Sequence, residues 1–387
     1  MRILIVTDQY APMVGGVPTV TRSLATGLAE RGHAVAVLAP SRDWRAGTGK
    51  DGRALVRYLG SFPWPLYEGM RVAVPISGVR ALFATVPDVV HIHSPLVLGV
   101  LAQIRARRLD VPVVYTNHYL PVNANPALGG GHRGFDDSFY AYVIGFSNRC
   151  SYVTAPSATA LGLLRDRGLR APSRVISNGV DAGTYSPGPA DEQLRDRYGL
   201  RRDRPLILSV GRLSPEKRID VLIAAAARLT HQAQVVIAGS GPQEADLRTM
   251  ADQLGVARRV TFLGHVPAAE LPSLYRLADI FAIASEAELQ SLTTMDAMAT
   301  GLPVVAADAY ALTELVRHGS NGFLFRRGRA DEMAAYLDAL AGDPGMRRAM
   351  AAAGSRIIRP HERLAALRAW ESLYGLLART GRRGRPR

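Results

Sequence analysis

The sequence predicts an α/β protein built from two units with parallel sheets, and three observations lead to this prediction. Short apolar runs rich in valine and isoleucine alternate with helical patterns, which is typical of parallel strands covered on both faces. The alternation stops between Tyr185 and Pro205 and then begins again. The length of 387 residues also suits two domains at about 150 residues each.

The apolar runs divide into two series of predicted strands. The first series covers residues 3–7, 34–39, 89–93, 112–116 and 152–155, and the second covers residues 206–210, 234–238, 260–263, 280–284 and 303–307. Between them, three prolines and the charged stretch from Asp196 to Arg204 predict an interdomain linker with a short helix. A final helix over residues 362–378 carries Leu364, Leu367, Trp370, Tyr374 and Leu377 on one face. We therefore expect domains over residues 1–186 and 187–360, a terminal helix over 361–378 that docks through this face, and a flexible basic tail over 379–387.

Composition excludes several classes of protein. No run approaches the ~20 apolar residues of a transmembrane helix. The first apolar run ends at Asp8, which is too early for a signal peptide. A single cysteine, Cys150, excludes an internal disulfide framework and a cysteine-based metal site. These features lead us to expect a cytoplasmic protein.

The net charge is strongly positive, at +14 from 47 basic and 33 acidic residues. Such a balance fits an anionic membrane surface, an anionic substrate or nucleic acid, but solvated arginines on surface helices would explain it equally well. The basic stretches lack the interleaved aromatic residues of single-strand binders, and no nucleic-acid-binding motif occurs. We therefore expect no nucleic-acid partner.

Three loops of the first series carry chemistry-bearing residues where a predicted strand ends. Gly15 and Gly16 precede a helix expected from about Thr19, and would let the backbone approach an anion at the helix N-terminus. His91-Ile-His-Ser-Pro95 and Tyr115-Thr-Asn-His-Tyr119 end two later strands. Ligands of open α/β sheets bind beyond such carboxyl ends. Taken one at a time, an ordinary glycine loop or a histidine satisfied within the chain explains each feature as well.

The second series of predicted strands also carries charged residues in the loops where its strands end. The segment Gly211-Arg-Leu-Ser-Pro-Glu-Lys217 follows a strand, and its two cations at a helix N-terminus suit a diphosphate. After the strand at residues 280–284, Glu288 lies in a loop and Asp296 lies inside the next helix. The N–H groups of Leu292 and Thr293 can hold phosphate oxygens, while Asp296 can accept hydrogen bonds from a ribose diol. Surface charge or dipole compensation would explain single residues, but not the whole strand–loop–helix–glycine–strand pattern.

The order of these motifs resembles the retaining glycosyltransferases of family 4 over nearly the whole chain. The landmarks are the Gly15-Gly16 loop, His91-Ile-His-Ser-Pro95, Ser177-Asn-Gly-Val-Asp181, Gly211-Arg212 with Lys217, Gly239-Ser-Gly-Pro242 and Gly264-His-Val266. The most specific is the family's E-x7-E motif, which reads Glu288-x7-Asp296 here, with Gln290-Ser291 where Phe-Gly is common. The resemblance implies the GT-B fold, in which two Rossmann-like α/β/α domains face each other across a cleft and the C-terminal helix crosses back to the N-terminal domain.

The resemblance also implies roles for individual residues. Arg212 and Lys217 would bind the donor diphosphate and stabilise the leaving UDP, Glu288 would bind hydroxyls of the donor sugar, and His118 would lie beside that sugar. The other donor-binding residues would be Gly16, Gly211, Gly239, Val266, Gln290, Ser291, Leu292, Thr293 and Asp296, with Asp296 on the ribose and the Val266 loop facing the base. On the acceptor side the candidates are Gly15, His93, Ser94 and Asn117. Because Asp296 is a methylene shorter than glutamate, ribose binding would need a small backbone shift or would weaken by about 1 kcal/mol, roughly fivefold.

The implied activity is the retaining transfer of a hexose to an acceptor hydroxyl by front-face attack, with glucose from UDP-glucose as the first choice. No Asp-x-Asp occurs in the chain, and Arg212 with Lys217 can neutralise the diphosphate, so we expect no metal and no other cofactor. GDP-mannose remains open as the donor, and a soluble natural product remains open as the acceptor. A nucleotide-sugar 2-epimerase would share the two-unit fold, although the Glu288–Asp296 spacing argues against it.

A membrane lipid is the preferred acceptor because of two further features of the first domain. The segment Ser61-Phe-Pro-Trp-Pro-Leu-Tyr67 is apolar and aromatic, and Arg105, Arg107 and Arg108 form a basic cluster. Together they could seat an anionic lipid surface, which would make the protein peripheral on the inner face of the plasma membrane. A packed loop and a solvated helix end explain the same residues.

Overall fold

The chain folds into two compact units. The computed structural model describes residues 1–11, 13, 15–63, 71–74, 85–121 and 133–382. Unit 1 comprises Met1–Gly179 and Leu364–Arg387, and unit 2 comprises Val180–Arg363. The division therefore falls before the boundary expected after residue 186, and the terminal helix belongs to unit 1. No helix in the described ranges is both long enough and apolar enough to cross a bilayer.

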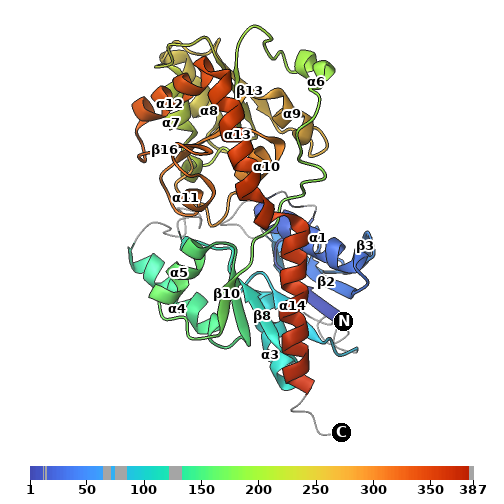
Figure 1. Cartoon of the computed structure of the whole chain (residues 1–387). Helices are drawn as coiled ribbons and strands as arrows, with labels where there is room; N and C mark the ends of the chain where they lie inside the picture. Colours follow the sequence, from blue (N-terminus) through green and yellow to red (C-terminus); the bar gives the residue numbers. More distant parts are fainter. Residues whose placement is uncertain (12, 14, 64–70, 75–84, 122–132, 383–387) are drawn as a thin grey trace. The chain divides into compact units, whose positions relative to one another are not determined.

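Unit 1 is built on an eight-stranded sheet in the order β10-β9-β8-β7-β1-β2-β4-β3 (Figure 1). Its strands are β1 (Arg2–Val6), β2 (Ala34–Pro40), β3 (Gly47–Asp51), β4 (Ala54–Leu59), β7 (Val89–Ile92), β8 (Val113–Thr116), β9 (Tyr152–Ala155) and β10 (Ser173–Val175). A separate ribbon pairs β5 (Ser61–Pro63) with β6 (Arg71–Ala73). The helices are α1 (Gly16–Glu30), α3 (Val97–Arg108), α4 (Arg133–Ser147), α5 (Ala158–Asp166) and α14 (Arg363–Arg382).

The sheet of unit 1 is parallel except at one edge, where β3 pairs with β4 in the antiparallel sense. The sequence analysis predicted the parallel strands of this sheet but did not include the antiparallel edge strand. A two-residue turn at Gly52-Arg53 joins the two strands, and Gly52 has a φ of 55°. Glycine at the first position of a two-residue turn is a hairpin signal because that position needs a positive φ. The signal was missed because the Gly47–Asp51 strand contains no apolar residue.

Two helices of unit 1 differ from expectation at their ends. Helix α1 begins at Gly16 rather than near Thr19, because proline is tolerated in the first turn, where its missing N–H costs no hydrogen bond. Helix α14 buries Leu367, Trp370 and Tyr374 in the core of unit 1, as its pattern predicted. Leu364 is 45% exposed, so it was wrongly placed on the docking face. Residues 383–387 of the expected tail lie outside the described residues.

Unit 2 is built on a six-stranded, wholly parallel sheet in the order β13-β12-β11-β14-β15-β16. Its strands are β11 (Leu206–Val210), β12 (Gln234–Ala238), β13 (Val260–Gly264), β14 (Ile280–Ile283), β15 (Val304–Ala307) and β16 (Gly322–Phe325). Its helices are α6 (Glu192–Arg197), α7 (Ile219–Ala226), α8 (Glu244–Gln253), α9 (Leu271–Leu277), α10 (Leu292–Thr300), α11 (Leu312–Leu315), α12 (Ala330–Gly342) and α13 (Pro344–Ile358), with 3-10 turns η3 (Pro215–Lys217) and η4 (Arg359–His361). The central strands are buried along their whole length, which explains their uninterrupted apolar runs.

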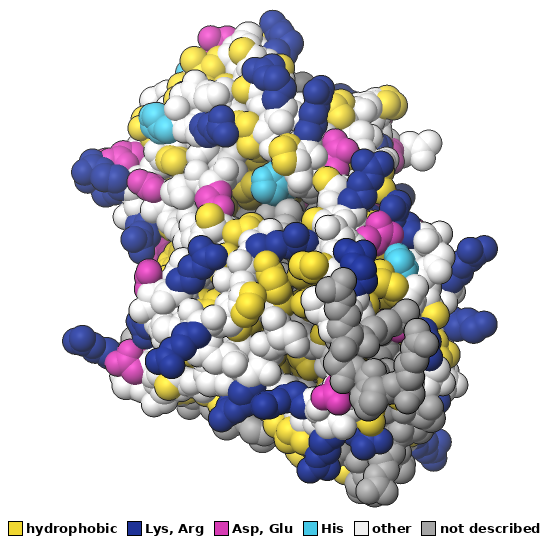
Figure 2. Space-filling model, turned by 60° about the horizontal axis from the view of Figure 1, so that its bottom comes forward, with side chains coloured by type: hydrophobic (Ala, Val, Ile, Leu, Met, Phe, Trp, Pro, Cys, Tyr) yellow, Lys and Arg dark blue, Asp and Glu magenta, His cyan; other side chains and the backbone are white. Residues whose placement is uncertain are grey.

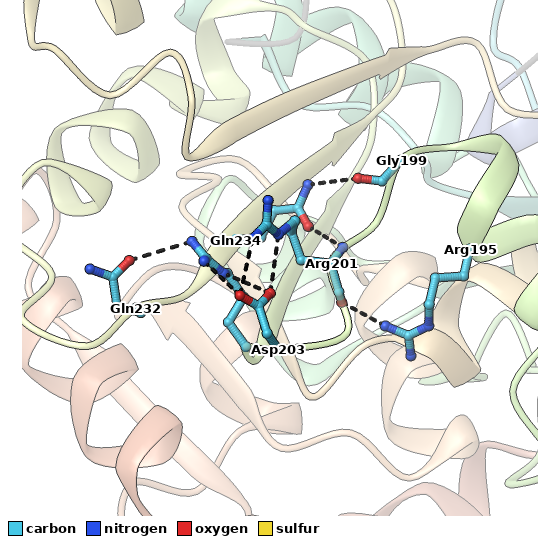
Figure 3. Close-up of polar contacts among 7 residues, drawn as sticks. Arg195, Gly199, Arg201, Asp203, Gln232 and Gln234 are labelled. Carbon is cyan, nitrogen blue, oxygen red and sulfur yellow. Dashed lines mark hydrogen bonds and ion pairs between the residues drawn. The ribbon is translucent and has the colours of Figure 1, made fainter.

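The segment predicted as an interdomain linker is part of unit 2. Gln234 on β12 holds it in place, because its side-chain oxygen accepts a hydrogen bond from the Arg201 N–H at 2.8 Å and its amide group donates to the Gly199 carbonyl at 3.5 Å. Figure 3 shows this contact beside the ion pair of Arg201 with Asp203. Arg195 of α6 donates to the Arg201 carbonyl at 2.8 Å. The prolines and charges therefore predicted the irregular backbone of this segment correctly, but they did not predict that it is attached to unit 2.

Both sheets reverse their strand order at one point. In unit 1 the reversal lies between β7 and β1, and in unit 2 it lies between β11 and β14. The loops that follow the two strands at such a point leave in opposite directions and open a crevice for a ligand. The loops after β1, β7, β11 and β14 are therefore where a site is expected.

Candidate functional site

The two loops at the reversal point of unit 2 are joined by an ion pair. Lys217 ends the η3 turn that follows β11, and Glu288 lies in the loop that follows β14. The Lys217 Nζ and Glu288 Oε1 atoms are 2.6 Å apart. The Glu288 side chain is 11% exposed and that of Lys217 is 27% exposed. Arg212 stands at the start of the same loop with an exposed side chain, so both predicted cations follow β11 at the reversal point.

A second set of contacts holds the η3 turn against the Glu288 loop. The Glu216 carbonyl accepts hydrogen bonds from the Glu286 N–H at 3.0 Å and from the Ser285 hydroxyl at 3.2 Å. Arg218 pairs with Glu286 at 2.7 Å and with Asp220 at 2.9 Å. Arg218 has a φ of 49°, a strained conformation for a residue with a side chain. The sequence analysis overlooked Arg218 and Glu286 because no residue pattern marks a loop-to-loop ion pair.

The glycines of this edge allow close backbone approach. A Cβ on Gly239 would lie 1.9 Å from the Gly211 carbonyl oxygen, and the Gly211 N–H donates to the Ala238 carbonyl at 3.0 Å. Both predicted glycines therefore bring the loops after β11 and β12 together. Val266 is 6% exposed and packs in the hydrophobic core of unit 2, so its side chain does not present a surface to a base. Only its backbone remains for the predicted contact.

The N-terminus of α10 supplies the predicted backbone donors. Ser291 caps the helix by accepting a hydrogen bond from the Thr294 N–H at 3.2 Å. Leu292 and Thr293 occupy the first turn, where N–H groups have no intrahelical carbonyl to bond. Gln290 is buried, and its side chain lies 3.4 Å from the His361 Nδ1 atom. The helix ends at Gly301, which has a φ of 92°.

Asp296 lies on α10 among groups that disfavour its charge. Burial, with a smaller contribution from Asp181, raises the pKa of Asp296 to about 8. Its other neighbours are Tyr185 and Tyr275, whose pKa values it helps to raise. A carboxyl group that is protonated at neutral pH can donate one hydrogen bond and accept others. This chemistry suits a pair of hydroxyl groups, which is the role predicted for Asp296.

In unit 1, the glycine loop and two histidines lie at the carboxyl edge of the sheet. Gly15 precedes α1, Gly16 is its first residue, and both are exposed. His93 follows β7 and His118 follows β8, with the His93 Nδ1 atom 2.9 Å from the His118 Nε2 atom. Burial lowers the pKa of His118 to about 4 and that of His93 well below its usual range. Both imidazoles are therefore neutral at neutral pH.

The side chains of Ser94 and Asn117 are hydrogen-bonded to other residues of unit 1. The Ser94 hydroxyl accepts from the Asp8 N–H at 3.1 Å and bonds the Tyr119 hydroxyl at 2.8 Å. The Asn117 side chain accepts from the Tyr115 hydroxyl at 3.0 Å and donates to the Tyr119 carbonyl at 3.2 Å. These bonds shape the edge of the sheet. A direct acceptor-binding role for Asn117 stays a prediction.

Sequence analysis assigned no role at this edge to two residues, Asp8 and Tyr374. Asp8 follows β1 and is 3% exposed. Tyr374 of α14 bonds the His91 Nδ1 atom at 2.7 Å. A polar residue at the end of a buried strand is the signal that could have identified Asp8. Among the residues that the structure describes, no group of three or more His, Cys, Asp or Glu side chains could hold a metal ion.

Two known protein families match the chain, one after the other along the sequence. The family described as Glycosyltransferase Family 4 matches residues 14–183, and the family described as Glycosyl transferases group 1 matches residues 190–356. The alpha-monoglucosyldiacylglycerol synthase of Streptococcus pneumoniae is 30% identical over 89% of this chain and 80% of its own. The GDP-mannose-dependent alpha-mannosyltransferase of Mycolicibacterium smegmatis is 31% identical over 84% of each chain.

Solved structures show the same fold. Alr3699/HepE of Anabaena, solved in complex with UDP and glucose, has a TM-score of 0.79 and 24% identity, over 97% of this chain and 99% of its own. This likeness shows the GT-B fold, in which each unit is Rossmann-like. With two relatives at 30% identity or more along most of their length and both family matches in order, the chain belongs to glycosyltransferase family 4.

Proposed function

We propose that this glycosyltransferase transfers a hexose with retention, taking glucose from UDP-glucose and placing it on the hydroxyl group of a membrane lipid. The observation that carries the proposal is the Lys217–Glu288 ion pair. The pair brings a cation that can bind a diphosphate close to a carboxylate that can bind sugar hydroxyls, at one reversal point and beside the N-terminus of α10.

Each residue of this site has a task in binding the donor. An ammonium group has three N–H donors, so Lys217 can bond Glu288 and a phosphate oxygen at the same time. Arg212 would add a planar guanidinium suited to two phosphate oxygens. The first-turn N–H groups of α10 would complete the diphosphate site, and Asp296 would hold the ribose hydroxyls.

The reaction needs little covalent chemistry from the protein. The bond between the sugar C1 and the phosphate oxygen breaks, and its electron pair stays on the UDP. The acceptor oxygen bonds C1 on the same face, and its proton passes to the departing phosphate oxygen. Arg212 and Lys217 stabilise the charge that develops on UDP. Because two fixed cations do this, the proposed reaction requires no metal.

A lipid acceptor is supported by the Streptococcus relative, whose name gives a diacylglycerol product, and by the surface. Trp44 is 75% exposed and Phe62 is 47% exposed in unit 1. Lys and Arg side chains are scattered among hydrophobic ones on the face in Figure 2. Of the segment predicted to seat a lipid, residues 64–67 lie outside the described residues. An anionic membrane surface is part of this proposal.

The Mycolicibacterium relative supports a second candidate, a mannosyltransferase that uses GDP-mannose. Calorimetry separates the two with UDP, GDP, UDP-glucose and GDP-mannose, in EDTA and in Mg²⁺, on wild type and on Arg212→Ala. We expect metal-independent binding of UDP that Arg212→Ala weakens. A preference for GDP would move the proposal to mannose transfer, and a lack of any nucleotide binding would refute the donor site.

A further inference from the structure

Asp8 has an unused hydrogen-bonding group in the interior of unit 1. The carboxyl group directly follows β1, and its residue is 3% exposed. The backbone of Leu98, in the first turn of α3, hydrogen-bonds this carboxyl and lowers its pKa. The Asp8 Oδ2 atom is buried, and it has no partner in the part of the chain that the structure describes. A buried acceptor without a partner is costly, which points to a ligand that supplies the missing hydrogen bond.

The position of Asp8 in the sheet is one where a ligand is expected. Asp8 follows β1, while His93 and Ser94 follow β7, and these two strands flank the reversal point of unit 1. The loops are fixed side by side, because the His93 N–H donates to the Val6 carbonyl at 2.8 Å and the Asp8 N–H donates to Ser94 at 3.1 Å. The His93 Nε2 atom is also buried and unpartnered among the described residues. Two unused polar atoms therefore lie on the loops where ligands of such sheets bind.

The charges of these loops disfavour an anionic ligand. Burial raises the pKa of Asp8 to about 7 and keeps His93 and His118 neutral. The hydrogen-bond partners described for these three residues include no cation. A phosphate group would bring negative charge next to a carboxyl group with no lysine or arginine bonded to it. A hydroxyl group could instead donate to the Asp8 Oδ2 atom and accept from an imidazole N–H.

We infer that Asp8 accepts a hydrogen bond from an uncharged hydroxyl-bearing group of the acceptor, at the side of unit 1 already predicted to bind the acceptor. This inference rests on the proposed function and specifies its acceptor. Asp8 is thereby a specificity-determining residue that favours a neutral polyol or glycerol group over its phosphomonoester. Its hydrogen bond with Leu98 fixes the carboxyl in place.

The test compares wild type with Asp8→Asn, which keeps the size of the side chain and removes its charge. Acceptors are dioctanoylglycerol in neutral detergent micelles, myo-inositol and inositol 3-phosphate, each with the donor that calorimetry selects. We expect turnover of an uncharged acceptor, and an acceptor KM about fivefold higher in Asp8→Asn, because an amide oxygen accepts a weaker hydrogen bond than a carboxylate oxygen does. The UDP Kd should stay within twofold. Asp137→Asn is the matched control, because this carboxylate is 61% exposed and pairs only with Arg167 among its described ion pairs.

The outcomes separate this inference from the proposed function. Preferred turnover of inositol 3-phosphate would overturn the inference, and so would an unchanged acceptor KM in Asp8→Asn. If the acceptor KM is unchanged and the melting temperature of Asp8→Asn is lower, the role of Asp8 is only to hydrogen-bond the first turn of α3. Misfolding of Asp8→Asn would show as a lost or broadened thermal unfolding transition, and Asp8→Glu, which keeps the charge, would then have to retain the preference for uncharged acceptors. No turnover of any acceptor by wild type would refute the proposed function itself.

Discussion

Four buried hydrogen bonds form a chain in unit 1, and the direction of donation along this chain can be tested. The Tyr374 hydroxyl bonds His91 Nδ1 at 2.7 Å, and His91 Nε2 bonds the Thr116 hydroxyl at 2.7 Å. Thr116 bonds Thr154 at 2.7 Å, and Thr154 reaches the Tyr115 carbonyl at 3.5 Å. A carbonyl can only accept, so Thr154 donates to it, Thr116 donates to Thr154, and His91 donates through Nε2. The Nδ1 atom of His91 must then accept from Tyr374.

Replacing Tyr374 with phenylalanine removes the first donor and leaves the ring packing. His91 and Tyr374 are both fully buried, so water cannot replace the lost donor without rearrangement. A buried acceptor left unsatisfied costs about 1–3 kcal/mol. We therefore expect Tyr374→Phe to lower the free energy of unfolding of unit 1 by this amount. The helix α14 would remain docked through Leu367, Trp370 and Leu373.

Two measurements check this prediction. Calorimetric or urea unfolding gives the change in stability, with Tyr336→Phe as the control, because the Tyr336 ring is half-buried and stacks on Phe323 at 4.7 Å. Nitrogen-15 spectra of the histidine rings report which His91 nitrogen carries the proton. A proton on Nδ1, or a loss of stability below about 0.5 kcal/mol, well under the value for an orphaned buried acceptor, would refute the direction of the chain.

Three further predictions concern unit 2 and the glycines. Lys217→Ala should weaken UDP binding about tenfold, as expected for a lost charge-assisted bond, while the chain's other lysine, Lys50, can be replaced without effect in the same calorimetry. Because the pKa of Asp296 is raised to about 8 from 3.8, the folded protein binds the extra proton and stability should fall as pH rises from 4 to 8. Asp296→Asn should flatten this fall in urea unfolding at several pH values. Gly239→Ala should destabilise unit 2 because its Cβ would lie 1.9 Å from a carbonyl oxygen, whereas Gly162→Ala, with nothing within 4 Å, should stabilise α5 by about 0.5–1 kcal/mol in thermal unfolding.

The strands that sequence analysis found are those buried on both faces. Leu206–Val210 and Gln234–Ala238 were predicted with their exact bounds, because parallel central strands produce unbroken apolar runs. Gly47–Asp51 was missed, since an exposed edge strand needs no apolar side chains. The helix at Leu292–Thr300 could be predicted from both ends, because a serine cap and a glycine stop are local signals.

The candidate site was predictable where one loop carries several polar residues. Arg212 and Lys217 could be selected because glycine, charge and strand end coincide in their loop, and Glu288 because it lies between a strand end and a helix that a glycine terminates. Arg218 and Glu286 could not, because their pairing spans two loops that only the fold brings together. Val266 was chosen from a motif, and the buried position of its side chain depends on packing that the motif does not contain.

The two reversal points differ in charge, and this difference is the strongest physical argument for dividing donor and acceptor between the units. In unit 2 the loops after β11 and β14 carry Arg212, Lys217 and the N-terminus of α10, which favour an anion such as a diphosphate, and the Glu288 carboxylate there is paired with Lys217. In unit 1 the loops after β1 and β7 carry the Asp8 carboxyl and the neutral His93. A diphosphate placed there would face a carboxyl group, while an acceptor hydroxyl would find both an acceptor and a donor. If the proposed function holds, the same strand reversal serves two ligands of different electrostatic demand, because the residues at the strand ends differ.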